Sequence, residues 1–148
     1  MKRRVVVGGT FDIIHVGHIR FLREAKKIAG GGELIVIVAR DSTVKRTKGH
    51  EPIFNERERL EIVQSLKPVD VAVLGKEDLN IFEILKELKP DVVVLGYDQK
   101  ISEDLLLEWA RKNNLKLEVI RLPKFSSRID SSSKVREKII VNMCTTNE

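Results

Sequence analysis

The sequence has almost no cysteine and few aromatic residues. Cys144 is the one cysteine among 148 residues, so the chain cannot close an intramolecular disulfide bond, which is typical of proteins from a reducing compartment. We interpret Cys144 as a free thiol near the end of the chain. Aromatic residues make up 5% of the sequence, which leaves few side chains for stacking on a bound ring system.

Long hydrophobic runs are also absent. The apolar run at residues 5–7 stops at Gly8, which makes it too short for the hydrophobic core of a signal peptide. No stretch approaches the roughly 20 apolar residues that cross a membrane. We therefore expect a cytoplasmic protein without membrane association. Its length fits a single domain over residues 1–148, with a flexible tail from about residue 142.

The charges present are unevenly distributed. Lysine and arginine number 27 against 22 acidic residues, a net charge of +5. This excess suits a polyanionic ligand such as a nucleotide or a nucleic acid, although an ordinary solvated surface accounts for it equally well. The longest polar stretch, residues 40–55, is strongly basic: it contains Arg40, Lys45, Arg46 and Lys48.

Strand-like and helix-like segments alternate along the chain. Five short runs rich in β-branched residues predict strands buried on both faces, at residues 5–7, 34–38, 71–74, 92–95 and 117–120. Amphipathic stretches predict helices at residues 16–28, 55–66, 80–88, 103–113 and 131–141. This order predicts an α/β fold: a three-layer sandwich with a five-stranded parallel sheet, of the Rossmann-like type.

Two histidines follow the first predicted strand. Gly8 and Gly9 let the backbone approach a ligand closely, and His15 and His18 lie on one face of the helix that begins there. A helix N-terminus presents free N–H groups to an anion, so the pattern indicates a phosphate cradle with two imidazole donors. Histidines in such positions are solvated or helix-capping residues about as often as they are phosphate-binding residues. We expect no metal site at them, because no third ligand lies nearby.

The string from residue 9 to residue 18 carries a more specific signal. Residues 9–12 read Gly-Thr-Phe-Asp and residues 15–18 read His-Val-Gly-His, directly after a strand and at the start of a helix. The combination resembles the signature of the nucleotidylyltransferase superfamily with the HIGH-type motif, in the form found in its small transferases. The resemblance implies catalytic roles for His15 and His18. It also implies contacts with a nucleoside triphosphate from Thr10, Phe11, His15, Val16, Gly17 and His18.

A second element of this superfamily lies near the C-terminus. Residues 131–136 read Ser-Ser-Ser-Lys-Val-Arg and resemble the superfamily's Ile-Ser-Ser-Thr element, a helix start that binds phosphates. Ser131, Ser132 and Ser133 are therefore candidate nucleotide-binding residues. Asp130 stands where the superfamily usually has isoleucine. Taken alone, serines before a helix are usually helix caps.

Two cations are further candidates. The resemblance implies a phosphate-binding lysine in the loop after the second strand, which fits Lys48 before Gly49, with Lys45 and Arg46 as alternatives. It also implies a catalytic arginine in the following helix, which fits Arg59. An arginine fork makes bidentate hydrogen bonds to phosphate. Each of these cations can instead be an ordinary solvated charge.

The segment after the fourth strand points to a narrower group. Residues 96–100 read Gly-Tyr-Asp-Gln-Lys, at the sheet edge where open α/β folds bind ligands. Asp98 can accept hydrogen bonds from a ribose or a base, or cap a turn. With residues 37–41 and 66–70, this segment resembles the archaeal FAD synthase group, which transfers AMP from ATP to FMN. That resemblance also implies a nucleotide contact at Phe125.

Several alternatives stay open. Glycerol-3-phosphate cytidylyltransferase, which uses CTP, is the nearest rival within the same fold, and the sequence fixes neither the base nor the acceptor. A non-catalytic module that binds nucleotides or nucleic acid is the alternative of another class. The intact set of His15, His18 and Lys48 favours an enzyme, because a pure binding module has no need for paired imidazoles. Related small transferases are often dimers, so a homodimer is possible.

These features lead to a hypothesis about mechanism. The phosphate of the acceptor attacks the α-phosphorus of the triphosphate directly, and pyrophosphate leaves. Catalysis then consists of positioning and charge stabilisation. His15, His18, Lys48, Arg59 and the serine-rich helix start hold the phosphates. We expect a divalent cation, Mg²⁺, to accompany the triphosphate.

Overall fold

The computed structural model describes residues 2–77, 80–125 and 128–145. Five strands form one sheet in the order β3-β2-β1-β4-β5, and every neighbouring pair is parallel. The strands are β1 (Arg4–Gly9), β2 (Glu33–Val38), β3 (Val71–Leu74), β4 (Val92–Leu95) and β5 (Glu118–Arg121). The predicted five-stranded parallel sheet is confirmed.

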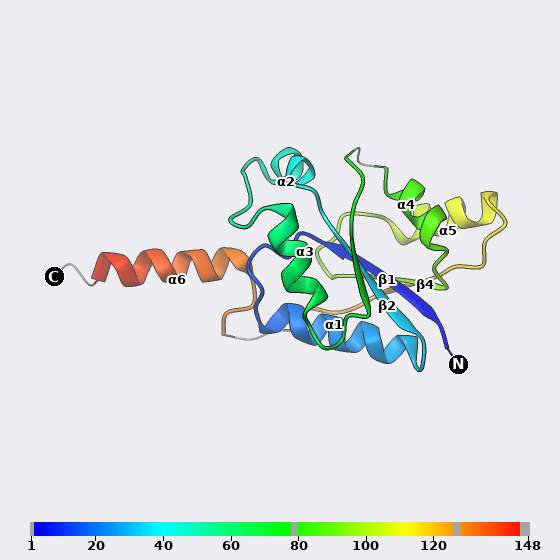
Figure 1. Ribbon diagram of the computed structural model, residues 1–148, viewed down its shortest axis with the longest axis horizontal. Coiled ribbons are helices and arrows are strands. Elements are labelled where there is room, and N and C mark those ends of the chain that lie inside the picture. The colour runs from blue at the N-terminus through cyan, green and yellow to red at the C-terminus, as the bar shows by residue number, and fades with distance from the viewer. Residues whose placement is uncertain (1, 78–79, 126–127, 146–148) are drawn as a thin grey trace.

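Helices cover both faces of this sheet (Figure 1). They are α1 (Val16–Ala29), α2 (Asp41–Lys48), α3 (Glu56–Gln64), α4 (Ile81–Leu88), α5 (Glu103–Lys112) and α6 (Ser132–Thr145). Helices α1 and α3 pack on one face, and α4 and α5 pack on the other. The result is the three-layer α/β sandwich that the alternating pattern predicts.

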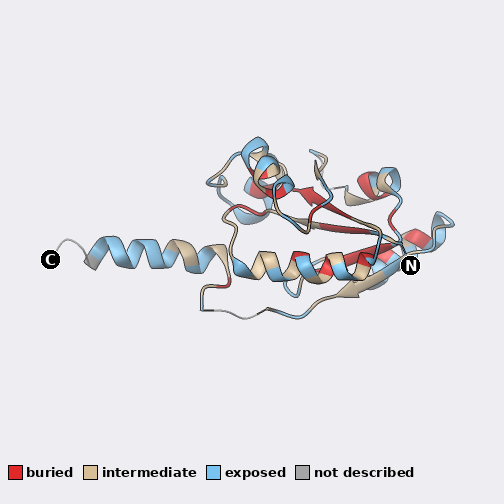
Figure 2. Ribbon diagram, turned by 60° about the horizontal axis from the view of Figure 1, so that its bottom comes forward, coloured by how far each residue is buried: buried red, intermediate tan, exposed pale blue. Residues whose placement is uncertain are grey.

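The core lies on both sides of the sheet because successive side chains of a strand point to opposite faces. Val5 and Val7 of β1 pack with Leu22 of α1, whereas Val6 packs with Ile84 of α4. All five side chains are at most 4% exposed. Figure 2 shows the buried residues concentrated along the strands and the helix faces turned toward them. Burial on both faces explains why the central strands β2, β1 and β4 read as continuous apolar runs, whereas the edge strands β3 and β5 are only partly buried.

The polar stretch after β2 differs from the expectation. We expected residues 40–55 to be a loop, but its first half is helix α2. Val44 is the one buried residue of this helix, so the sequence shows no amphipathic period there. Gly49 ends the helix in the left-handed conformation at φ 78°, which a glycine adopts without strain, and its N–H donates to the Lys45 carbonyl at 2.9 Å.

Helix α6 projects from the body of the molecule (Figure 1). The Ser131 hydroxyl accepts from the Lys134 N–H at 3.1 Å, which confirms a serine cap at its start. The helix continues to Thr145, past the point near residue 142 where we expected a flexible tail, and residues 146–148 lie outside the described part. Within the described residues, no helix has both the length and the hydropathy needed to span a bilayer.

Candidate nucleotide site

The turn after β1 is shaped by two tight contacts. Phe11 adopts φ 53° and is 4% exposed, so its ring is buried in the apolar layer shared with α1. A Cβ atom on Gly9 would lie 2.8 Å from that ring, which leaves no room for a side chain. A non-glycine residue with positive φ is uncommon and is tolerated where the surroundings fix it. Gly9 and Phe11 therefore fix the backbone that leads into α1.

Asp12 holds this turn against the segment before α3. Its carboxylate is 5% exposed and accepts from the backbone N–H groups of Ile53 and Phe54, both at 2.9 Å. Arg136 of α6 lies 3.8 Å from the same carboxylate. The acidic residue of the Gly-Thr-Phe-Asp motif thus joins three segments that are distant in sequence, and its oxygens are already engaged in doing so.

His15 and His18 lie together at the start of α1. Their ring centroids are 3.9 Å apart. The Gly17 N–H donates to Nδ1 of His15 at 3.1 Å, and the His15 N–H donates to Nδ1 of His18 at 3.2 Å. Because both Nδ1 atoms accept, the neutral rings carry their protons on Nε2. The backbone of the helix start therefore selects the tautomer of both histidines.

The histidines are neutral at ordinary pH. The pKa of His18 falls to about 4, chiefly because the ring is buried and also because His15 and Lys48 are close by. Burial likewise lowers the pKa of His15, against an opposing contribution from Asp130. Both imidazoles thus offer uncharged Nε2–H donors at the N-terminus of a helix.

Gly17 makes room for this arrangement. A Cβ atom at residue 17 would lie 2.9 Å from Cε1 of His15 and 3.4 Å from the Asp130 carbonyl oxygen. The second contact shows that the segment before α6 passes close to the start of α1. Val16, beside Gly17, is 41% exposed and leaves the helix start open on that side.

The start of α6 joins the same site. The Ser132 hydroxyl donates to the Ile13 carbonyl at 3.2 Å, while Ser133 is exposed. Asp130 is buried and pairs with Lys134 at 2.7 Å and with Lys124 at 3.5 Å. The unexpected acidic residue is therefore neutralised by two lysines. Two helix N-termini, those of α1 and α6, meet where the phosphates were expected.

Lys48 is the exposed cation of this region that is best placed to reach a ligand. It is the last residue of α2 and is close enough to His18 to lower that ring's pKa. In contrast, Lys45 pairs with Glu51 at 3.4 Å, and Arg46 donates to the Glu77 carbonyl at 3.2 Å. Within the described part of the chain, Lys48 has no carboxylate partner. The geometry thus favours Lys48 over the two alternatives.

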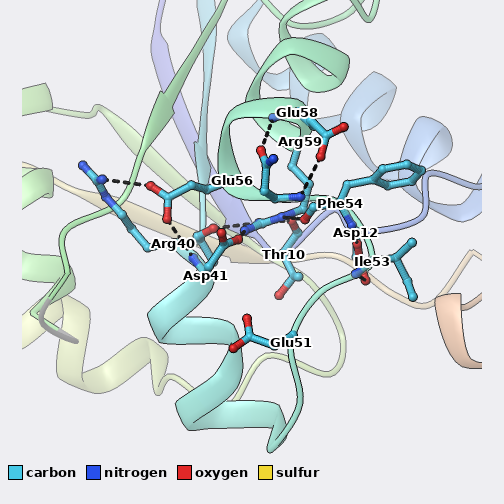
Figure 3. Close-up of polar contacts among 12 residues, drawn as sticks. Thr10, Asp12, Arg40, Asp41, Glu51, Ile53, Phe54, Glu56, Glu58 and Arg59 are labelled. Carbon is cyan, nitrogen blue, oxygen red and sulfur yellow. Dashed lines mark hydrogen bonds and ion pairs between the residues drawn. The ribbon is translucent and has the colours of Figure 1, made fainter.

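Arg59 requires a correction. We expected its guanidinium to contact phosphate, but the side chain is 0% exposed. Figure 3 shows it enclosed by the segments around it. It donates to three carbonyl oxygens and one carboxylate: Phe54 O at 2.9 Å, Thr10 O at 2.8 Å, Ala39 O at 2.6 Å and Asp41 Oδ1 at 2.7 Å. A guanidinium engaged in this way positions the ends of β1 and β2 rather than binding a phosphate.

The remaining expected residues lie around the rim. Thr10 is half-buried and its carbonyl accepts from Arg59. Asp98 is exposed in the segment after β4, and Phe125 is half-buried in the loop after β5. These two loops lie close together, as the 5.6 Å distance from Lys124 Nζ to the ring centre of Tyr97 shows. The structure therefore gathers the segments after β1, β4 and β5 at one edge of the sheet.

Sequence reasoning missed Arg121 at the end of β5. Its Nη1 donates to the carbonyls of Gly96 at 2.7 Å and Gln99 at 2.9 Å, and its Nη2 donates to the Ile101 carbonyl at 2.8 Å. The remaining N–H groups donate to Glu103, from Nε at 3.0 Å and from Nη2. All five donors of the guanidinium are used on the segment after β4. The one sequence signal was an arginine at the last position of the strand, directly after the apolar pair Val119 and Ile120.

Gln99 ties the same segment to β1. Its side-chain oxygen accepts from the Gly96 N–H at 2.7 Å, and its amide nitrogen donates to the Gly8 carbonyl at 3.0 Å. Strands β1 and β4 are neighbours on either side of the point where the strand order reverses. Arg121 and Gln99 together fix the loop where Asp98 stands.

Comparison with known proteins agrees with this geometry. Residues 6–138 match the family model described as cytidylyltransferase-like. The chain belongs to the cytidylyltransferase-like family. The match spans the histidine pair, the segment after β4 and the first half of α6, so it covers every element that forms the site.

Relatives within the cytidylyltransferase-like family match nearly the whole chain. A FAD synthase of Thermococcus sibiricus is 46% identical over 97% of this chain and 96% of its own length. A FAD synthase of Korarchaeum cryptofilum is 50% identical over 99% of this chain and 97% of its own length. Among solved structures, a lipopolysaccharide core biosynthesis protein from Thermoplasma volcanium matches with a TM-score of 0.78 and 44% identity, covering 84% of this chain and 98% of that one.

Proposed function

We propose that the chain is an FMN adenylyltransferase, which transfers AMP from ATP to FMN to give FAD and pyrophosphate. The observation that carries this proposal is the pair of neutral imidazoles at the start of α1, each held with its proton on Nε2. Relatives named FAD synthases, which are similar over nearly their full length, support the choice of ATP and FMN.

The reaction is a direct displacement. An oxygen of the FMN phosphate attacks the α-phosphorus of ATP, the bond from that phosphorus to the bridging oxygen breaks, and pyrophosphate leaves with the electron pair. The attacking phosphate is already ionised, so the protein need supply no nucleophile. It must align the two phosphates and stabilise the charge that builds up on the oxygens.

His15 and His18 would supply that stabilisation. Neutral Nε2–H groups can donate to phosphate oxygens without transferring a proton, and their orientation is fixed before the substrate arrives. Lys48 would add a full positive charge from the end of α2. Ser131 to Ser133, at the start of α6, would place N–H groups and hydroxyls against the remaining oxygens.

The residues around the nucleotide also form part of the proposal. Thr10, Phe11, Val16 and Gly17 would line the triphosphate, while Asp98 and Phe125 would contact the ribose or base. Arg59 belongs to this site as a positioning residue, because its carbonyl partners include Thr10. A cytoplasmic setting, where ATP and FMN are both present, completes the proposal.

We assign the triphosphate a divalent cation, Mg²⁺, of the kind that nucleotidyltransferases use to neutralise phosphate charge. Within the described residues, no group of three histidine, cysteine or acidic side chains could form a protein cage for a metal ion. A site of this kind suits Mg²⁺, because that ion keeps several water ligands and is held largely by the phosphates of the substrate. When bound, the ion would neutralise charge on the triphosphate.

Pyrophosphate release tests the proposed function. The protein is given ATP or CTP, each with FMN or glycerol 3-phosphate, at equal concentrations and with Mg²⁺. We expect release with ATP and FMN to exceed the other three mixtures by at least about 10-fold. Release only with CTP and glycerol 3-phosphate would replace this proposal with the cytidylyltransferase alternative. Release in none of the mixtures would contradict both.

A further inference from the structure

A cavity of about 280 Å³ opens beside the nucleotide site, on the face of the sheet that α4 covers. Its lining includes Gly8 of β1, Ile37 of β2 and Gly75 just after β3, together with Thr43, Ile81 and Ile84 from the surrounding helices. We call it the aliphatic pocket. Its volume is close to the lower end of the range for small-molecule sites, roughly 300–1,000 Å³.

We propose that the aliphatic pocket binds the isoalloxazine ring of the flavin acceptor. The proposal rests on the proposed function, because it assigns the acceptor half of the same reaction. It goes further by naming the residues that would select a flavin over a small phosphorylated polyol.

Sheet topology separates the two substrates. The aliphatic pocket lies over the ends of β1, β2 and β3, which form one half of the sheet. The segment after β4 and the loop after β5, which would hold the nucleotide, belong to the other half, and of these two segments Gln99 alone also lines the pocket. Gly9 and Thr10 line the pocket and also lead into the histidine pair. A flavin ring in the pocket would therefore have its phosphate directed toward the junction between the halves.

The walls of the pocket suit a flat apolar ring. Ile37 and Ile84 are 7% and 4% exposed, so their positions are fixed by the core, and Ile81 is half-buried at the start of α4. The ring system of a flavin is broad and largely apolar, and aliphatic side chains can cover its faces. The three-carbon chain of glycerol phosphate would leave most of this surface uncovered, which favours the flavin.

Two glycines provide the space. A Cβ atom on Gly8 would meet no atom closer than 3.8 Å, and one on Gly75 would meet Ile37 Cγ2 at 3.5 Å and the Val38 carbonyl at 3.6 Å. These are ordinary contact distances, so folding does not require glycine at either position. What glycine provides at these two positions is the free volume of the pocket itself.

Thr43 supplies a polar group beside the apolar walls. Its Oγ1 is the one buried side-chain oxygen or nitrogen in the described residues without a hydrogen-bond partner. A buried hydroxyl without a partner is unfavourable, and threonine in a helix populates two rotamers. A carbonyl or ring nitrogen of a flavin seated in the pocket would give this hydroxyl a partner after one such rotation.

Steady-state kinetics with Gly75→Leu test the pocket. The leucine Cβ atom fits, so the rest of its side chain must enter the cavity. We expect the KM for FMN to rise at least about 10-fold, because small changes in pocket volume alter affinity by this order. The KM for ATP should stay within about twofold. Gly31→Leu is the matched control, since Gly31 is exposed and its Cβ atom would meet only Lys2, at 3.5 Å.

Thr43→Val is a second test of the pocket assignment, and it does not depend on pocket volume. Removing the hydroxyl should raise the KM for FMN about 2- to 10-fold, the effect of one hydrogen bond, without lowering the melting temperature. Lumiflavin, the ring without its phosphate, should inhibit competitively against FMN, and Gly75→Leu should weaken this inhibition.

The outcomes separate this inference from the proposed function. Wild-type protein that makes no FAD from ATP and FMN overturns the proposed function. If the wild-type protein is active, an unchanged KM for FMN in folded Gly75→Leu and in Thr43→Val overturns the pocket assignment. A rise in the KM for ATP equal to the rise for FMN also overturns it, because the pocket would then hold the nucleotide.

Discussion

At the scale of single residues, the site depends on how backbone groups hold two side chains. The Nδ1 atoms of His15 and His18 both accept from backbone N–H groups of the same helix start. The spacing of the two histidines in the sequence predicted that they would lie on one face. The lowered pKa values follow mainly from burial of the two rings, which no local sequence pattern reveals.

The pH dependence of the free energy of unfolding should show that His18 is buried and uncharged. Its pKa is about 4 in the folded protein and 6.5 in an unfolded chain, so below pH 6.5 the unfolded chain binds more protons than the folded one. The free energy of unfolding should therefore fall as the pH drops from 6.5 toward 4. We expect His18→Asn to lose less stability across this interval, measured by urea denaturation at each pH. Parallel curves for the two proteins would contradict the assignment.

Arg59 shows what the sequence could not tell about a charged residue. The resemblance to the small transferases implied a phosphate ligand at this position, but the structure buries Arg59 among carbonyl oxygens. A sequence motif can point to an arginine in the site. It does not show whether that arginine binds substrate or holds the substrate-binding segments together.

Loss of Arg59 should therefore reduce stability. Arg59→Ala leaves three backbone carbonyls and the partly exposed Asp41 carboxylate without their donor, and each buried acceptor left unsatisfied costs about 1–3 kcal/mol. Urea denaturation measures the loss. The matched control is Arg57→Ala, an exposed position on the same helix, which should change stability by less than about 0.5 kcal/mol. Equal effects of the two substitutions would contradict a positioning role.

At the scale of elements, the sheet was predictable and the connections were not. The central strands β2, β1 and β4 are buried on both faces and therefore stand out as apolar runs, and the bounds of β3 and β4 were predicted to the residue. Helix α2 was missed because Val44 alone carries its buried face. The segment after β4 was correctly placed at the sheet edge, but the contacts that give it its shape come from β5.

Arg121 should control that segment. Arg121→Lys retains the charge but cannot reach the three carbonyls at once, so the loop with Asp98 would lose its fixed shape. We expect the KM for ATP to rise about 5-fold or more, with a smaller change in the KM for FMN. Lys116→Arg, an exposed site just before β5, serves as the control. A change in the melting temperature without any change in the KM for ATP would contradict the assignment.

At the scale of the whole molecule, α6 has two parts with different roles. Its start contacts the β1–α1 loop through Ser132, whereas residues 137–144 are all exposed, with Ile139, Ile140 and Met143 each more than 50% exposed. The sequence predicted the first part from its serines. The exposure of the second part was not predicted, and the expected homodimer stays a prediction.

Truncation after Glu137 tests this division. Because the side chains of residues 138–144 are exposed, the shortened protein should keep its melting temperature within about 2 °C and retain turnover, which would also show that Cys144 is not required. Sedimentation of both forms would show whether the distal half of α6 joins two chains. A large loss of thermal stability in a shortened protein whose oligomeric state is unchanged would contradict the division.

The fate of the α-phosphorus tests the central claim most directly. ATP labelled at this phosphorus is incubated with FMN, Mg²⁺ and wild-type protein, and the products are separated. Direct transfer predicts that the label appears in FAD, in equal amounts with the pyrophosphate released, and that none is bound to the protein. Label recovered only as AMP, or attached to the protein before FMN is added, would contradict direct adenylyl transfer from ATP to FMN.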